Sequence, residues 1–286
     1  MSDCINVAFN CSDAFVNGLL TTIYSLLINN KNYFFNIFSA GPLSEENKNK
    51  IKKFVGKKAN LYFVEVDDTI FRSSLDEQNY FYIGLRRLLL PFILKDVDKL
   101  LYLDSDLIVN KDISMLWDAD IGDCYIGSIL DISSNNKIVE KFVRENNLDE
   151  YFNSGVILFD CKHIRKDLNV SGITDIIKSH ELPYFDQDIL NLLYRDRIFK
   201  INPTYNFQTF PDSLYKKRQL KHQSIVHYLG TKPWNLGYPI TDPKFRFFWK
   251  YGIKTFGLFS FFKLTFTKPI VLFKIKFKRT ISKIFH

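Results

Sequence analysis

Two carboxylates follow an apolar run near the middle of the sequence. Asp104 and Asp106 come directly after residues 100–103 and precede the apolar residues 107–109. In an extended segment, side chains two positions apart point the same way, so both carboxylates would converge at the end of a strand. Two such carboxylates repel each other unless a cation joins them, and oxygen ligands suit Mg²⁺ or Mn²⁺. The pattern indicates a divalent metal site, with a surface turn as the alternative.

A second cluster of polar residues surrounds His227, which ends another apolar run. As a third ligand beside the two carboxylates, an imidazole would favour Mn²⁺ over Mg²⁺. Gly230 would let the backbone approach a ligand closely, and Lys232 would supply a point charge for a phosphate group. A hydrogen-bonded structural histidine is the alternative interpretation of His227.

Two further segments carry amides and acids. Asn153 lies beside Gly155 on a predicted turn that leads into the strand 156–159. Asp186 and Asp188 lie at the predicted start of a helix. Ordinary structural roles are the alternatives here, because asparagine is common in turns and aspartate caps helices.

The elements that would position these residues alternate between strands and helices. The sequence predicts strands at 5–9, 33–39, 61–66, 99–103 and 125–130. It also predicts helices at about 15–29, 42–53 and 80–94. This alternation indicates an α/β fold with a mostly parallel sheet and helices on both faces. Ligands bind such sheets beyond the carboxyl ends of the strands, which is where the two carboxylates lie.

Three common motifs do not occur in the sequence. There is no G-x-G-x-x-G, no P-loop and no G-x-S-x-G, so dinucleotide binding, Walker-type ATP binding and serine hydrolysis lack their signatures.

Taken in chain order, the polar segments resemble retaining glycosyltransferase family 8, particularly its bacterial lipopolysaccharide and lipooligosaccharide glucosyl- and galactosyltransferases. The resemblance covers roughly residues 5–240. It rests on this ordered series: Asn6-Val7-Ala8-Phe9, Ser12-Asp13-Ala14-Phe15, Arg87-Leu88, Leu101-Tyr102-Leu103-Asp104-Ser105-Asp106, Asp131, Phe152-Asn153-Ser154-Gly155-Val156, Asp186-Gln187-Asp188, and His227-Tyr228 with Lys232-Pro233-Trp234. Two positions depart from the family pattern, since Ser12 replaces an acid and Leu85 replaces a tyrosine that is common there.

The resemblance implies a single GT-A-like, Rossmann-like domain that binds a UDP-sugar and Mn²⁺, with Mg²⁺ as the alternative ion. The implied metal ligands are Asp104, Asp106 and His227. The implied contacts to the nucleotide and its diphosphate are Ala8, Asn10, Ser12, Asp13, Arg87, Asp104, Ser105, Asp106, Gly230 and Lys232. The sugars would face Asp131, Asn153, Ser154, Gly155, Asp186 and Gln187.

The implied activity is the transfer of glucose or galactose, with retention, to a glycolipid or lipopolysaccharide-type acceptor. We favour front-face attack, in which Gln187 stabilises the sugar cation and the leaving phosphate accepts the proton of the acceptor. Asp186 as a covalent nucleophile is the alternative. A metal-dependent nucleotidyl or phosphoryl transferase, and a peripheral membrane or nucleic-acid binding protein with structural acids, are the other classes considered.

The net charge of +8 comes from the C-terminal end of the chain. Residues 244–286 hold 9 Lys and 2 Arg but no Asp or Glu, which leaves 28 basic against 31 acidic residues upstream. We therefore divide the chain into a transferase domain at 1–240 and a basic aromatic tail at 241–286.

The tail predicts two basic amphipathic helices, one on each side of Pro269. Read at about 100° per residue, its two apolar stripes are Phe245, Phe248, Trp249, Gly252, Phe256 and Phe259, and then Phe273, Phe277, Ile281 and Ile284. Basic helices rich in Phe and Trp lie on anionic membranes, which is the interpretation we favour. Packing onto the domain core and RNA binding by aromatic stacking are the alternatives.

The length of 286 residues suits one large α/β domain or two smaller ones. The four cysteines have no disulfide or zinc spacing, the first residues lack the pattern of a secretory signal, and no apolar run spans a membrane. We expect a cytoplasmic protein that associates peripherally with the inner face of the cytoplasmic membrane and binds no nucleic acid.

Overall fold

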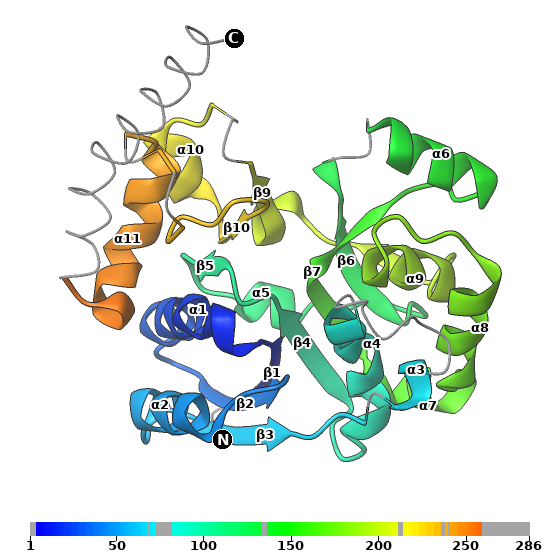
Figure 1. The fold of residues 1–286 in the computed structure, drawn as a ribbon, viewed down its shortest axis with the longest axis horizontal. Coiled ribbons are helices and arrows are strands. Elements are labelled where there is room, and N and C mark those ends of the chain that lie inside the picture. Colours follow the sequence, from blue (N-terminus) through cyan, green and yellow to red (C-terminus); the bar gives the residue numbers. More distant parts are fainter. Residues whose placement is uncertain are drawn as a thin grey trace, which may run out of the picture.

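The computed structural model describes residues 4–67, 69–72, 82–132, 136–210, 214–235, 238–239 and 241–258, and Figure 1 shows its ribbon. A seven-stranded sheet lies at the centre, in the order β3-β2-β1-β4-β7-β6-β8. Its strands are β1 (Cys4–Asn10), β2 (Phe34–Ala40), β3 (Asn60–Val64), β4 (Lys99–Leu103), β6 (Ile126–Leu130), β7 (Phe152–Asp160) and β8 (Ile198–Lys200).

Most strand pairs of this sheet are parallel. β3, β2, β1 and β4 run in one direction, and β8 runs parallel to β6. β7 is antiparallel to both of its neighbours, β4 and β6. The predicted α/β fold with a mostly parallel sheet is therefore confirmed.

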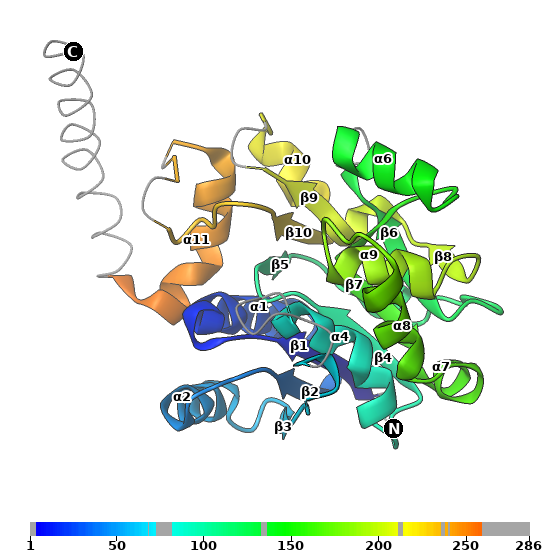
Figure 2. The same cartoon turned by 45° about the vertical axis from the view of Figure 1, so that its right-hand side comes forward.

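Helices cover both faces of the sheet (Figures 1 and 2). One face is covered by α1 (Val16–Asn29), α2 (Glu45–Val55) and the short α5 (Ser114–Trp117). The other face is covered by α4 (Tyr82–Ile93), α7 (Cys161–Asp167), α8 (Ser171–Ser179) and α9 (Asp186–Leu193). The remaining described helices are α3 (Thr69–Arg72), α6 (Lys137–Glu145), α10 (Lys217–His222) and α11 (Pro243–Phe256), with 3₁₀ turns at Asp13–Phe15 and Pro203–Asn206.

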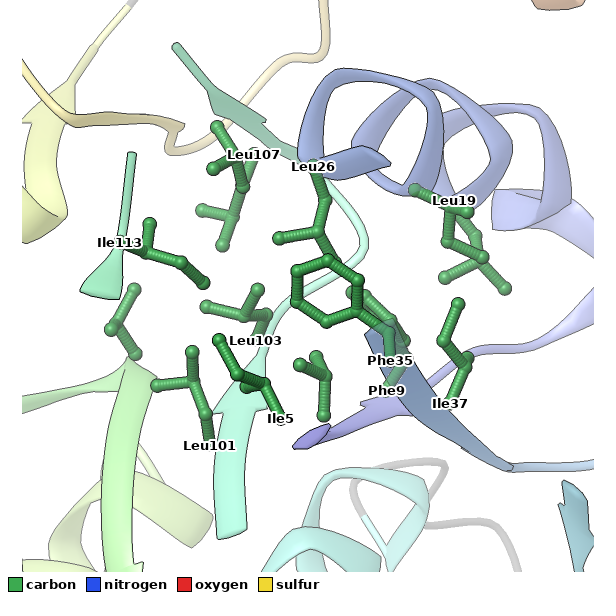
Figure 3. Close-up of a cluster of buried hydrophobic side chains, with 14 of the residues drawn as sticks. Ile5, Phe9, Leu19, Leu26, Phe35, Ile37, Leu101, Leu103, Leu107 and Ile113 are labelled. Atoms are coloured by element: carbon green, nitrogen blue, oxygen red, sulfur yellow. The ribbon is translucent and has the colours of Figure 1, made fainter. Parts of the chain in front are cut away.

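The side chains of β1 point alternately to the two faces of the central sheet, which explains why helices pack on both faces. Ile5 and Phe9 point to the α1 side, where Figure 3 shows Phe9 near Leu19 and Leu26 of α1. Ala8 points to the opposite face. Successive strand residues face opposite sides of a sheet, and a strand that is apolar on both sides is typical of the interior of an α/β domain.

A second, three-stranded sheet adjoins the carboxyl end of β4. β4 leads through a short turn into β5 (Leu107–Val109), which pairs antiparallel with β10 (Ile225–Tyr228). β10 in turn pairs parallel with β9 (Phe207–Thr209). This arrangement brings β10, which lies far along the chain, next to the end of the central strand.

Two local predictions near the site were wrong. Residues 152–155 were expected on a turn, but they are the first residues of β7, where Asn153 pairs with Ile129 of β6. Asp104 and Asp106 were expected on an extended segment, but the chain turns between β4 and β5 at these residues. Polar residues can occupy the interior of β7 because side chains of α9 satisfy their hydrogen bonds.

The first apolar stripe of the tail was expected on a membrane but lies in the protein core. Phe245 and Phe248 of α11 are 1% and 0% exposed, in one cluster with Ile108 of β5 and Val226 of β10. An amphipathic pattern has the same period whether the apolar face meets lipid or protein. Here the outer face of the small sheet supplies the protein surface, as the alternative interpretation expected. Phe259 and the second stripe lie outside the described residues.

No helix in the described part of the chain is long and apolar enough to cross a membrane. All four cysteines are free, and Cys11 and Cys161 are buried. Burial raises the pKa of the Cys11 thiol to about 12, so this thiol is in its neutral form at physiological pH.

Candidate active site

The structure brings Asp104, Asp106 and His227 together between the two sheets. The Nε2 atom of His227 lies 3.3 Å from Asp106 Oδ1 and 3.7 Å from Asp104 Oδ2. One ligand atom from each residue lies within 4.8 Å of the others. The turn after β4 supplies the carboxylates, and β10 supplies the imidazole. A backbone hydrogen bond of 3.2 Å from Tyr228 N to Asp106 O ties the two segments together.

The hydrogen bond from His227 to Asn206 shows which ring nitrogen carries a proton and which one faces the carboxylates. Nδ1 lies 2.9 Å from Asn206 Oδ1, which can only accept, so Nδ1 carries the proton and donates. Nε2 is then the nitrogen that faces the two carboxylates. Asp106 Oδ1 is buried and has no hydrogen-bond donor among the described residues. Carboxylate oxygens and an imidazole nitrogen that converge in a buried site can share one divalent cation, and this set of ligands suits Mn²⁺ or Mg²⁺.

Lys232 compensates the charge of Asp106. Its Nζ contacts Asp106 Oδ2 and donates to the carbonyl of Tyr228 at 2.7 Å. Burial alone would raise the pKa of Asp106, but the positive charge of Lys232 opposes this effect and the pKa is lowered. The lysine was predicted to meet a diphosphate, and the structure places its ammonium beside the Asp106 carboxylate. Gly230 has a φ of 66°, which favours glycine in the turn before Lys232.

Arg87 of α4 joins the two halves of the site. It lies 3.1 Å from Asp104 Oδ1 and 3.2 Å from Asp186 Oδ2, and it donates to the Ser154 carbonyl at 2.7 Å. The guanidinium also lies over the ring of Tyr102, 4.9 Å from its centroid. Although burial opposes the charge, the two carboxylates raise the pKa of Arg87, which stays protonated.

A network of amides and a carboxylate surrounds Gln187 at the start of α9. Its Oε1 accepts from Asn153 Nδ2 and Ser154 N, both at 3.1 Å. Its Nε2 donates to Asp131 Oδ2 at 3.1 Å, and Asn153 Nδ2 donates to the same oxygen at 2.9 Å. Four of the residues predicted to face the sugars therefore form one hydrogen-bonded cluster.

Asp186 lies next to this cluster and is already paired. Its Oδ2 accepts from Ser154 Oγ at 3.2 Å in addition to its contact with Arg87. Burial raises the pKa of Asp186, while the charge of Arg87 opposes this effect. α4 can approach so closely because a Cβ on Gly84 would lie 2.8 Å from Asp186 Oδ1.

The residues predicted to line the nucleotide pocket are spread around the end of β1. Ala8 is buried within the sheet, and Asn10 donates to the carbonyl of Ile83. Asp13 is exposed and accepts from Ser44 N at 3.0 Å, a bond that lowers its pKa. The structure gives this carboxylate a role at the start of α2.

Ser12 and Ser105 were also expected near the nucleotide. The Ser12 side chain makes no capping hydrogen bond in the 3₁₀ turn that follows it. Ser105 is 7% exposed, and its carbonyl would lie 2.8 Å from a Cβ on Gly18 of α1. The close packing of α1 on the turn after β4 therefore depends on a glycine.

Sequence reasoning missed Asn206 and did not anticipate how Gly155 packs against His227. Asn206 is 2% exposed and contacts both His227 and Asn153. Gly155 was expected to face the sugars, and the structure adds that a Cβ there would lie 2.3 Å from His227 Cε1, so the glycine makes room for the imidazole. Nothing in the local sequence signals either role, because the partners lie on other elements.

The family model for glycosyl transferase family 8 matches residues 6–236. The chain belongs to glycosyl transferase family 8. General stress protein A of Bacillus subtilis is 27% identical over 72% of the chain and 79% of its own length. The lipopolysaccharide 1,2-glucosyltransferase of Escherichia coli K12 is 25% identical over 82% of the chain and 74% of its own length.

Among solved structures, the galactosyltransferase LgtC in complex with donor and acceptor sugar analogs has a TM-score of 0.72 and 24% identity. The match covers 88% of this chain and 96% of LgtC. At this identity the likeness shows the fold, so the expected GT-A-like fold is confirmed. The family match also confirms the expected enzyme class, a glycosyltransferase, over the nucleotidyl-transferase and non-enzymatic alternatives.

Proposed function

We propose that this family 8 glycosyltransferase transfers a hexose, glucose or galactose, from a UDP-sugar to a lipopolysaccharide-type glycolipid. In this proposal Mn²⁺ is bound and the product is α-linked. The observation that carries the proposal is the convergence of Asp104, Asp106 and the Nε2 atom of His227. The imidazole favours Mn²⁺ over Mg²⁺ as the ion.

The diphosphate end of the donor would lie at this cluster. Asp104, Asp106 and His227 would hold the cation, which when bound supplies a Lewis acid for the phosphate oxygens. Lys232 would add a second positive charge beside the leaving group, since its Nζ already lies at Asp106. Arg87 would keep Asp104 oriented through its 3.1 Å contact.

The sugar end of the donor would lie over the cluster that contains Gln187. We infer that the bond from the anomeric carbon to the diphosphate oxygen breaks while the acceptor hydroxyl oxygen forms its bond on the same face. The proton of that hydroxyl goes to the leaving diphosphate. Gln187 would stabilise the positive charge on the sugar through its amide oxygen, and Asp131 and Asn153 would bind hydroxyl groups of the sugars.

The donor and acceptor classes rest on the names of relatives and on the family resemblance. The E. coli relative is a lipopolysaccharide glucosyltransferase, and the structurally similar LgtC is a galactosyltransferase. Both names describe hexose transfer, and the first names a lipid-anchored acceptor. The proposal brings these two features to the present chain.

The test is release of UDP by the purified full-length protein from a panel of UDP-sugars, with Mn²⁺, Mg²⁺ or a chelator. We expect slow metal-dependent release from UDP-glucose or UDP-galactose, accelerated by a lipooligosaccharide acceptor. Asp106→Asn removes a negative charge from the ligand set with little change in shape, so release should fall at least about 100-fold.

The matched control is Asp98→Asn, which changes an exposed aspartate that pairs with Arg165 outside the site. This variant should release UDP like the wild type. Absence of UDP binding in the wild type, with or without metal, would refute the proposal. Release that is unaffected by a chelator would refute its metal dependence.

A further inference from the structure

We propose that Asn206 is a positioning residue that holds His227 in its metal-binding tautomer and couples it to the amide of Gln187. The inference deepens the proposed function and rests on it. Asn206 ends the 3₁₀ turn Pro203–Asn206, directly before β9, and is 2% exposed.

The polarity of the network starts from a backbone group. The N–H of Gly155 donates to Asn153 Oδ1 at 3.0 Å, and a backbone N–H can only donate. This bond determines which end of the Asn153 amide is the oxygen. Asn206 must then present its NH₂ group to Asn153 Oδ1, and the two atoms lie 2.8 Å apart.

The same logic continues to the metal ligand. Because the NH₂ group of Asn206 faces Asn153, its Oδ1 faces His227 Nδ1 at 2.9 Å. An amide oxygen only accepts, so Nδ1 must carry a proton, and Nε2 is the nitrogen that faces Asp104 and Asp106 and can serve as the metal ligand. One backbone N–H of β7 thus determines, through two amides, the tautomer of a side chain on β10.

A second backbone group orients the other end of the network. Ser154 N donates to Gln187 Oε1 at 3.1 Å, which leaves Gln187 Nε2 to donate to Asp131. Asn153 Nδ2 joins the two halves, since it donates to Gln187 Oε1 at 3.1 Å. Asn206 is therefore the link between the metal ligand and the residue beside the proposed sugar position.

Two substitutions separate the two contacts of Asn206. Asn206→Asp keeps an acceptor for His227 Nδ1 but puts a carboxylate oxygen against Asn153 Oδ1, so only the contact to Asn153 is lost. Asn206→Leu has a similar volume and removes both contacts. Loss of an outer hydrogen bond to a histidine ligand typically weakens metal affinity about 10- to 100-fold.

The first measurement is the tautomer of His227 in metal-free protein, from nitrogen-15 NMR of labelled histidines assigned with a His227→Gln variant. We expect protonated Nδ1 in the wild type and in Asn206→Asp, and a mixture of tautomers in Asn206→Leu. The second is Mn²⁺ affinity, from the electron paramagnetic resonance signal of the free ion. We expect affinity near wild type for Asn206→Asp and about 10- to 100-fold weaker binding for Asn206→Leu.

The matched control is Asn30→Leu. Asn30 is 1% exposed, and within the described part of the chain its side-chain amide forms hydrogen bonds only with backbone groups, those of Leu26, Lys111 and Ile113. This control removes a buried amide that makes no contact with the site. The His227 tautomer and the Mn²⁺ affinity should therefore match the wild type even if the stability of the protein falls.

An unprotonated Nδ1 in the wild-type enzyme would overturn the proposal without the need for any variant. Wild-type tautomer and affinity in a folded Asn206→Leu variant would overturn it as well. Protonated Nδ1 without any Mn²⁺ or Mg²⁺ binding would instead refute the proposed function while supporting the role of Asn206. The Asn206→Asp variant loses the hydrogen bond to Asn153 that connects His227 to Gln187. Its turnover should therefore fall at least tenfold while its Mn²⁺ affinity is retained.

Discussion

At the scale of single residues, His227 and Gly155 show how closely the site is packed. A Cβ on Gly155 would lie 2.3 Å from His227 Cε1 and 2.8 Å from its Nδ1. Real Cβ atoms do not approach so closely, so the ring would have to move away from the two carboxylates.

Gly155→Ala should therefore lower stability by about 1 to 3 kcal/mol and weaken Mn²⁺ binding at least tenfold. Chemical denaturation and Mn²⁺ titration measure the two effects. Gly172→Ala in α8 is the matched control, because a Cβ there meets Leu193 Cδ1 of α9 at an ordinary 3.4 Å. Equal effects of the two substitutions would contradict the explanation.

Asp186 and Gln187 have different hydrogen-bond and charge partners, and this difference helps to distinguish a covalent mechanism from front-face attack. Asp186 is held by Arg87 and Ser154. Asp186→Asn should slow UDP release because Arg87 loses a partner, but it should leave measurable turnover. No sugar adduct should be detected by intact-protein mass spectrometry of wild type incubated with donor. An adduct located on Asp186, together with complete loss of turnover in the variant, would establish the covalent mechanism instead.

Asp188 is an acid held in a buried position by neutral donors. Tyr151 donates to its Oδ1 at 2.5 Å and Tyr184 N donates to its Oδ2 at 2.6 Å. Burial raises the pKa of Asp188 to about 6. Because the unfolded chain releases this proton near pH 4, the folded state binds more protons between about pH 4 and 6.

Stability should therefore fall as pH rises through that window, by roughly 2 to 3 kcal/mol from this one group. Asp188→Asn carries no titratable proton, so its unfolding free energy should depend less on pH over the same range. Urea denaturation at several pH values measures the difference. Parallel pH profiles for the two proteins would show that Asp188 does not titrate there.

At the scale of elements, α11 gives the clearest case in which packing decides the role of a sequence pattern. Trp249 Nε1 donates to the Pro233 carbonyl at 3.2 Å, and the Phe248 ring lies 5.1 Å from that of Trp234. Trp234 lies two residues after Lys232, so α11 supports the segment that carries this lysine. Through these contacts, α11 packs as part of the transferase domain.

Phe248→Ala should destabilise the protein by about 3 to 5 kcal/mol, since Phe248 is 0% exposed. UDP affinity should also fall in the folded fraction, because Trp234 loses a ring contact. Leu214→Ala is the control, as Leu214 is 99% exposed and the change should stay within about 0.5 kcal/mol. Thermal unfolding followed by circular dichroism measures both. A stability for Phe248→Ala near that of the wild type would contradict the core position of α11.

At the scale of the whole molecule, the charge distribution leaves the C-terminal end as the most basic part of the chain. Residues 259–286 hold 6 Lys and 1 Arg with no acidic residue, and they lie outside the described part of the structure. Contact with an anionic membrane remains a prediction that rests on this composition. Residues 243–256 are no longer part of the predicted membrane-binding segment, because all their aromatic side chains except that of Phe256 are buried.

Deletion of residues 259–286 should abolish sedimentation with anionic liposomes while leaving UDP binding and thermal stability near the wild type. Deletion from residue 244 onward removes α11 and should destabilise the domain, so the shorter truncation is the informative one. Neutral liposomes control for charge. Unchanged sedimentation of the shorter truncation would contradict the membrane prediction.

Several features of this protein were determined by its sequence alone. Alternating apolar strands and helices predicted the α/β sheet, because each strand must bury both faces. The run 100–103 before Asp104 and Asp106 predicted where a cation would bind, since residues just after a strand of such a sheet lie at its ligand-binding edge. These signals are local, and one stretch of chain carries each of them.

Only the tertiary structure decided the features that depend on distant partners. Asn206 contacts His227 and Asn153, which lie 21 and 53 positions away, and no local pattern encodes such a contact. The apolar face of α11 packs against the protein core because β5 and β10 supply an apolar surface there. A sequence records which side chains are apolar or polar, whereas their partners are determined only when the elements pack together.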